Sequence, residues 1–159
     1  MDENILIKMA ELEEDFFHTK DDPTQADTTL ECSHQLLRLH PSAIKGIIKD
    51  GEPISWVITM PTSRELAERF LKDEITEHEL LDVTEPRDVY DALYLLIAFT
   101  VPEHRGNRYT AGLFEQAIRE IPHTSDTLFV SWPFSEGGKK VLERVEKDLG
   151  ISISLKKHE

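Results

Sequence analysis

The sequence predicts a single α/β (α+β) domain built around a mixed β-sheet that is flanked by helices. The chain has 159 residues, the usual size of one domain and enough for one substantial hydrophobic core. The run Val89–Val101 is almost entirely apolar, which is typical of a strand buried on both faces of a sheet. A β-hairpin pattern precedes this run, and alternating helix and strand patterns follow it. A hairpin that leads into a sheet covered by helices is characteristic of this fold class.

The composition excludes several classes of partner. Thirty-one acidic residues against 18 basic ones give a net charge of −13, which argues against a surface for nucleic acids or anionic membranes. This charge suits a cationic substrate or a basic peptide, and the alternative interpretation is that it serves solubility. The longest apolar stretch, residues 92–101, is about half of what a membrane span needs. The acidic N-terminal residues lack the pattern of a secretory signal. With Cys32 as the single cysteine, no intrachain disulfide forms, and we expect a reducing, cytoplasmic location.

Residues 1–41 are expected to form two N-terminal helices. In the first, apolar residues recur at three- and four-residue steps along residues 2–19, the stripe of a surface helix. A break is expected at residues 20–23, Lys-Asp-Asp-Pro. The second helix, which ends near His40-Pro41, carries on one face Ala26, Leu30, Ser33 and Leu37.

Two strands joined by a turn are expected in residues 43–60. Ala43–Lys49 and Ile54–Met60 are rich in Ile and Val and are separated by residues 50–53, Asp-Gly-Glu-Pro. Gly51 supplies the positive φ that such a turn needs. The pattern therefore predicts a β-hairpin.

Residues 62–82 are expected to form a helical insertion that covers the sheet. Two capping-box patterns, Thr62-Ser63-Arg64-Glu65 and Thr76-Glu77-His78-Glu79, predict the starts of two short helices. The segment holds too little apolar surface for a core of its own, so we expect a cover and not a second domain.

Residues 89–157 are expected to form the core of the domain. Helices and strands are distinguished here by the spacing of apolar residues, which is three to four in a helix and two in a half-buried strand. The expected elements are, in order, the strand Val89–Val101, a helix over Asn107–Ile121, a strand over Thr127–Trp132, a helix over Glu136–Leu149 closed by Gly150, and a last strand over Ile151–Leu155.

The turn between the first strand and the first helix of this core has the features of an anion site. Residues 100–113 read Thr-Val-Pro-Glu-His-Arg-Gly-Asn-Arg-Tyr-Thr-Ala-Gly-Leu, a buried strand that runs through a short turn into an amphipathic helix. The first amides of such a helix have no partners within it, and the helix dipole makes their surroundings positive. Arg105 and Arg108 add fixed positive charge, and His104 adds more when it is protonated. This arrangement suits a pyrophosphate.

This segment resembles the acyl-CoA-binding motif of the GNAT superfamily. In that family a valine and a proline end a strand, and an Arg-Gly-rich turn leads into the next helix. The residues of this chain that match the pattern are Val101, Pro102, Arg105, Gly106 and Leu113. The order of elements from residue 43 to residue 155 is similar to that of the family too. The resemblance implies a GNAT-like fold, with acetyl-CoA or another acyl-CoA as co-substrate. The residues implied in binding it are Thr100, Val101, Arg105, Gly106, Asn107, Arg108, Tyr109 and Thr110.

The resemblance also implies an N-acyltransferase that passes an acyl group directly to a primary amine, without a covalent enzyme intermediate. A thioester is already activated, so the protein mainly aligns the reactants and stabilises the oxyanion. In the family a strand amide does this, and in this chain that amide falls near Thr100–Val101. The candidates for the general base are Glu103 and His104, for which a solvated turn is the alternative interpretation. The acceptor is expected to be a neutral or cationic small molecule or peptide, because the net charge opposes anions.

The sequence departs from the family pattern in two respects. Arg108 and Thr110 stand where the pattern has glycine and a small residue, so the Arg108 side chain either clasps the phosphates or crowds them. Residues 138–149 contain no tyrosine, the residue that protonates the leaving thiolate in many members, so the expected proton donors in its place are the hydroxyl groups of Ser135 and Ser131.

These departures favour a second hypothesis, a catalytically inactive GNAT-fold module that binds CoA or a protein partner. A third hypothesis is an interaction domain whose turn binds nothing. A homodimer is compatible with all three hypotheses, and none of them requires a metal ion. Binding of CoA and release of its thiol would separate them.

Other polar and aromatic residues have ordinary structural interpretations. Tyr90 and Tyr94 point to one face of the expected strand and are predicted to lie in the core or to line a pocket. Residues 77–79, Glu-His-Glu, are expected to form a solvated helix face with a cap and not a metal site. Trp132 and Phe134 are expected either to line an acceptor cleft or to pack in the core.

Overall fold

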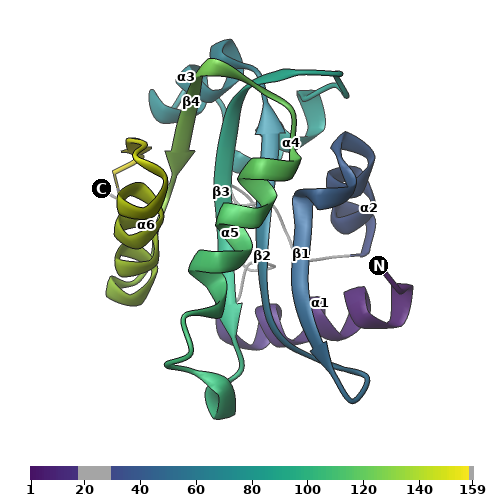
Figure 1. The fold of residues 1–159 in the computed structure, drawn as a ribbon. Coiled ribbons are helices and arrows are strands. Elements are labelled where there is room, and N and C mark those ends of the chain that lie inside the picture. The colour runs from purple at the N-terminus through teal and green to yellow at the C-terminus, as the bar shows by residue number, and fades with distance from the viewer. Residues whose placement is uncertain (18–29, 158–159) are drawn as a thin grey trace.

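The described residues, 1–17 and 30–157, form one mixed sheet whose five strands lie side by side in sequence order (Figure 1). The strands of this computed structural model are β1 (Ile44–Lys49), β2 (Glu52–Thr62), β3 (Tyr90–Thr100), β4 (His123–Ser131) and β5 (Ile153–Leu155). β2 runs antiparallel to both of its neighbours, β1 and β3, whereas β3, β4 and β5 run parallel to one another. The expected mixed α/β class is confirmed. The expected break at residues 20–23 and Ala26 lie outside the described residues.

Six α-helices of the described chain cover the two faces of this sheet (Figure 1). They are α1 (Glu3–Phe17), α2 (Leu30–Leu39), α3 (Arg64–Leu71), α4 (Glu77–Val83), α5 (Tyr109–Glu120) and α6 (Glu136–Leu149). α1 and α2 share a face, because Trp56 of β2 donates to Glu13 of α1 and Tyr90 of β3 donates to the carbonyl oxygen of Leu39. α5 covers the opposite face, in front of β2 in Figure 1. None of these helices is both long and apolar enough to cross a membrane.

The turn between β1 and β2 has the left-handed geometry of a tight hairpin. Both Asp50 and Gly51 have positive φ values, 52° and 77°. Turns with two such residues match the right-handed twist of the strands that they join. The hairpin and the role of Gly51 are confirmed, and Asp50 shares that role.

The insertion between β2 and β3 contains one confirmed cap and one corrected cap. At α4, Thr76 accepts from the Glu79 amide while the Glu79 side chain accepts from the Thr76 amide, as the capping box predicts. At α3, Thr62 was expected in this role, but the N-cap is Ser63, whose Oγ accepts from the amide of Leu66 at 3.2 Å. Thr62 is still part of β2, so the helix begins one residue later.

Most boundaries in the C-terminal half follow the sequence pattern closely. α6 spans the expected residues and ends at Gly150, which has a φ of 66°. α5 begins at Tyr109 and not at Asn107, because the turn before it is longer than expected. β4 begins at His123, four residues before the predicted start, and β5 begins at Ile153, two residues after it. These shifts occur where a strand end depends on its neighbour in the sheet.

Candidate functional site at the divergence of two strands

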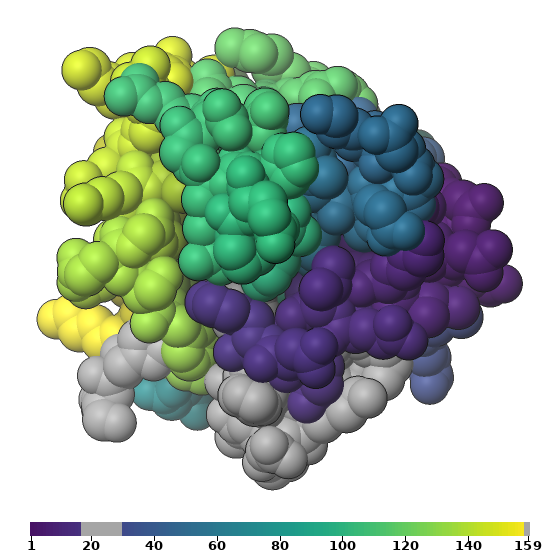
Figure 2. All heavy atoms as spheres, turned by 90° about the horizontal axis from the view of Figure 1, so that it is seen from below, coloured from purple at the N-terminus to yellow at the C-terminus, as the bar shows by residue number. Residues whose placement is uncertain are grey.

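The parallel strands β3 and β4 separate before β3 ends. Their parallel pairing ends at Leu95 and Ser131, whereas β3 continues to Thr100 while paired with β2 on its other side. The register between β2 and β3 skips Leu96, an irregularity that bends a strand. The divergence opens a cavity of about 630 Å³ between β3, the turn before α5, the segment after β4 and the start of α6. Figure 2 shows this end of the molecule, where the turn (green), α1 (purple) and α6 (yellow-green) meet.

Beyond Leu95, alternate backbone amides of β3 point toward the edge of the strand that β4 no longer pairs with. The amide of Val101 donates to the carbonyl oxygen of Ile54 at 2.9 Å, so it points toward β2. Amides along a strand alternate in direction, so those of Ala98 and Thr100 point toward the cavity. Of the expected oxyanion donors near Thr100–Val101, the Val101 amide is therefore already occupied, and Val101 does not line the cavity.

The turn before α5 contains two residues in left-handed conformation. Gly106 has a φ of 91°, and Arg108, the N-cap residue of α5, has a φ of 58°. A residue with a β-carbon is strained in this conformation, which explains physically why a glycine would be favoured at position 108. The first amides of α5 donate no hydrogen bond to a capping side chain of Arg108, the N-cap residue.

Arg105 is held in place at the end of β3. Its Nε donates to the carbonyl oxygen of Thr100 at 3.1 Å, and its guanidinium lies over the ring of Phe16 of α1, 5.6 Å from the ring centre. The guanidinium has further N–H groups beyond Nε that are suited to an external acceptor. Asn107 stabilises the same turn by donating to the carbonyl oxygen of His104 at 2.8 Å.

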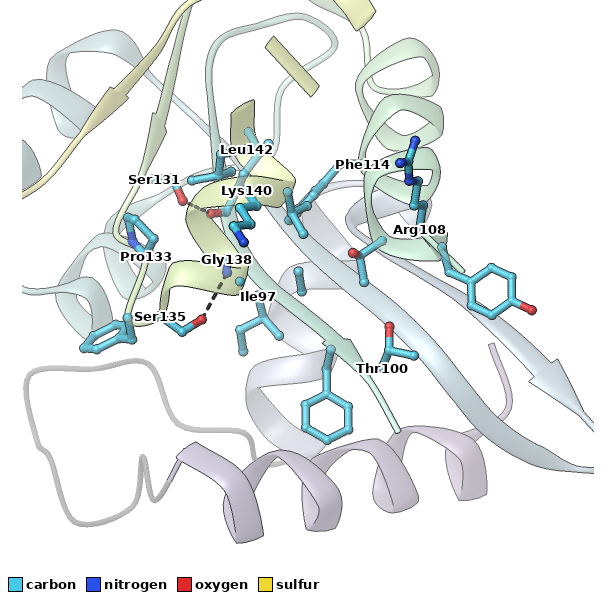
Figure 3. A pocket seen from close by; sticks show the side chains of 18 of the residues that line it. Ile97, Thr100, Arg108, Phe114, Ser131, Pro133, Ser135, Gly138, Lys140 and Leu142 are labelled. Atoms are coloured by element: carbon cyan, nitrogen blue, oxygen red, sulfur yellow. Dashed lines mark hydrogen bonds between the residues drawn. The ribbon is translucent and has the colours of Figure 1, made fainter. Parts of the chain in front are cut away.

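The charges that line the cavity have one sign. Among the described lining residues, the charged side chains are Arg105, Arg108 and Lys140, and none is a carboxylate. This contrasts with the chain as a whole, which carries a net charge of −13. Figure 3 shows Arg108 and Thr100 on one side of the cavity and Ser131 and Ser135 on the other, with Lys140 between them. The cavity is therefore suited to an anion.

Two serines line the side of the cavity opposite the turn. Ser131 is buried and donates its hydroxyl hydrogen to the carbonyl oxygen of Leu95 at 2.6 Å, so this hydrogen is not free to protonate a ligand. Ser135 is the N-cap of α6, and its Oγ accepts from the amide of Gly138 at 3.0 Å. A hydroxyl that accepts still has its own hydrogen to donate. Of the two expected donors, only Ser135 retains that capacity.

The rest of the cavity is largely apolar. Leu95, Phe114 and Leu142 line it with buried side chains. Trp132 and Phe134, with ring centres 4.9 Å apart, form an aromatic wall after β4. The two rings line the cavity, and Trp132 also packs edge-on against Phe70 of α3, with ring centres 5.9 Å apart.

Several sequence-predicted residues lie elsewhere. Glu103 is exposed in the 3₁₀ turn Pro102–His104 and does not line the cavity, so it is not placed to act as a general base there. Tyr90 and Tyr94 are fully buried, as expected. The expectation of a solvated face at residues 77–79 is wrong for Glu77, which is buried and accepts from the Tyr94 hydroxyl. Burial and the nearby Glu77 raise the pKa of Tyr94 well above its usual value.

The sequence analysis missed Lys140 and the α1 contribution to the cavity. A signal for Lys140 was present, since residues 137–140, Gly-Gly-Lys-Lys, follow a strand and open a helix as the residues before α5 do. No local signal connects Phe16 of α1 with Arg105, because 89 positions of chain separate them before folding brings them together. Six of the eight expected binding residues form a continuous lining segment from Arg105 to Thr110, and Thr100 joins them.

The fold and the cavity together define this protein as a mixed α/β domain with a cationic, partly apolar cavity at the point where two parallel strands diverge. No family model, curated protein or solved structure matches the chain. The site's chemistry is therefore argued from the residues that line it.

Proposed function

We propose that this chain is an acyl-CoA-dependent N-acyltransferase with a GNAT-like fold, which binds acetyl-CoA or another acyl-CoA in the cavity. The acyl group passes directly to a primary amine. The observation that carries the proposal is the lining of three cationic side chains without a described carboxylate, in a protein of net charge −13. A long anionic ligand is the class that such a cavity selects.

The order of groups along the cavity supports this ligand. Phosphates suit Arg105, Arg108 and the first amides of α5, which lack a side-chain cap. An extended arm with amide groups suits the open edge of β3 from Leu96 to Thr100, because exposed strand edges pair with extended chains. The thioester then lies toward Ser131, where β4 ends.

The transfer reaction requires few catalytic groups from the protein. The amine nitrogen attacks the thioester carbonyl carbon, a C–N bond forms, and the C–S bond breaks with its electron pair leaving on sulfur. A strand amide such as that of Ala98 is suited to stabilise the oxyanion. The thiolate takes up a proton, for which the Ser135 hydroxyl and the Lys140 ammonium are donors on the α6 side of the cavity. The amine loses its proton to water, and a neutral or cationic acceptor is favoured by the net charge.

A second candidate function is supported by one observation. No Asp, Glu or His is present among the described residues that line the cavity, so no side chain there is suited to act as a general base. A catalytically inactive module that binds CoA in the same place agrees with this lining.

Binding and chemistry are tested separately. Titration calorimetry and thermal melting with CoA are expected to detect binding, since a ligand at a hundred times its dissociation constant adds about 2.7 kcal/mol to the free energy of unfolding. The variant Arg105→Glu is expected to lose this shift. Lys49→Glu, an equal change of charge at the β1–β2 hairpin outside the cavity, is the control and is expected to keep it.

Release of free thiol from acetyl-CoA in the presence of a panel of primary amines tests the transfer step. Thiol release that depends on an amine supports the transferase. Binding of CoA without thiol release for any amine supports the inactive module. A melting temperature unmoved by millimolar CoA contradicts both.

A further inference from the structure

The end of the cavity opposite the turn is mainly apolar. Trp132, Pro133 and Phe134 form it from the segment after β4, and Val141 and Leu142 form it from α6. Figure 3 shows Pro133 on this side and Arg108 on the other, with β3 crossing between them. The two ends therefore suit different parts of one elongated ligand.

The hydroxyl groups at this end are engaged within the protein. Ser131 donates to the carbonyl oxygen of Leu95 at 2.6 Å, and Ser135 accepts from the amide of Gly138 at 3.0 Å. The hydroxyl hydrogen of Ser131 is therefore not available to a ligand, and among the described lining residues the one hydroxyl hydrogen left at this end is that of Ser135. This end of the cavity therefore favours an apolar ligand group.

The aromatic wall has surface that a ligand can cover. Phe134 is 53% exposed even though its ring centre lies 4.9 Å from that of Trp132. Transfer of apolar surface out of water is favourable, and each methylene that becomes buried tightens binding by about fourfold. An acetyl group has a single methyl group, so it can cover only a small part of the apolar surface of Phe134.

From these observations we infer that the cavity selects acyl-CoA molecules whose acyl chain has several carbons, with the chain lying against Phe134, Trp132 and Leu142. The inference rests on the proposed function, because it assumes that the phosphates bind at the turn. From there the open edge of β3 leads from Thr100 back to Leu96, a span of about 13 Å at about 3.3 Å per residue. The ligand's acyl end therefore reaches the aromatic wall.

The alternative occupant of the wall is the acceptor amine. In that case the length of the acyl chain has no effect on binding, because the chain does not touch Phe134. The two arrangements are distinguished by comparing ligands that differ in the acyl group alone.

The test is calorimetric titration of the full chain with CoA, acetyl-CoA and hexanoyl-CoA. We expect hexanoyl-CoA, with four more methylenes than acetyl-CoA, to bind at least about tenfold more tightly than acetyl-CoA. Phe134→Ala is expected to reduce this ratio to about threefold or less. Ile48→Ala, which truncates an exposed side chain of β1 at the far edge of the sheet, is expected to leave the ratio unchanged.

The outcomes distinguish a failure of this inference from a failure of the proposed function. Equal affinities for acetyl-CoA and hexanoyl-CoA overturn this inference and leave the proposed function intact, as does a ratio that Phe134→Ala does not alter. If none of the three ligands binds, the proposed function fails and this inference fails with it.

Discussion

The hydroxyl of Ser131 donates to the carbonyl oxygen of Leu95 at 2.6 Å, at the last register pair between β3 and β4. This bond runs from a side chain of β4 to the backbone of β3. It therefore joins the two strands at the point where they diverge and where the cavity begins.

Ser131→Ala and Ser135→Ala are expected to have different effects on function but similar effects on folding. Each should lower the free energy of unfolding by about 1 kcal/mol, the first by removing a buried hydrogen bond and the second by removing a helix cap. Only Ser135→Ala should lower the turnover number, because the hydroxyl hydrogen of Ser131 is committed to Leu95. Urea denaturation and amine-dependent thiol release measure the two effects. A loss of turnover confined to Ser131→Ala would refute this assignment.

Lys140 and Lys139 form a matched pair for testing the charge of the cavity. Both lie in α6, but only Lys140 lines the cavity. Lys139 instead forms an ion pair with Glu136, with 3.4 Å between its Nζ and Oε1 of Glu136. Lys140→Glu is expected to weaken CoA binding by about tenfold or more, and Lys139→Glu by less than about twofold at physiological salt. The affinity of the native chain should fall as salt rises. Equal losses in the two variants would show that net charge, and not the lining, determines affinity.

The left-handed conformation of Arg108 predicts an unusual effect on stability. Arg108→Gly and Arg108→Ala both remove the charge, but only glycine adopts a φ of 58° without strain from a β-carbon. The glycine variant is therefore expected to have the higher free energy of unfolding, by about 1 kcal/mol. Both variants should bind CoA more weakly than the native chain. Urea denaturation compares the two, and a more stable alanine variant would contradict the prediction.

Glu13 makes the stability of the fold depend on pH. Burial in α1 raises the pKa of its carboxyl to about 8, although the hydrogen bond from Trp56 opposes this. Below pH 4.5 the carboxyl is protonated in both the folded and the unfolded chain. From pH 4.5 to about 8 the unfolded chain loses this proton while the folded chain keeps it, so stability falls as pH rises.

Glu13→Gln keeps an acceptor for Trp56 and removes this titration. Relative to the native chain, the variant should gain stability between pH 5 and pH 8, by up to about 1.4 kcal/mol per pH unit. Urea denaturation at several pH values measures the difference. Glu11→Gln, an exposed change on the same helix, is the control. A difference that does not change with pH would show that Glu13 is ionised in the folded protein.

Local patterns predicted many of the elements because their causes are local. The ends of α6, with Gly150 at its C-terminus, and the Thr76–Glu79 cap depend on residues a few positions apart. The expected binding segment from Arg105 to Thr110 also lines the cavity, because a strand, a turn and a helix in succession project that turn from the end of the sheet. Thr62 failed as a helix cap because its partner in β3 keeps it in β2.

The sequence by itself determined the α/β class, the hairpin at Gly51, the buried strand β3 and the turn that carries Arg105, since these follow from periodicity and turn chemistry. Only the tertiary structure decided that β3 and β4 diverge at Leu95 and Ser131, that Lys140 lines the cavity and that Glu103 does not. These facts depend on the register of strands and on the docking of helices that are distant in the chain. Such contacts leave no mark on the local pattern, because they are selected by the packing of the whole core.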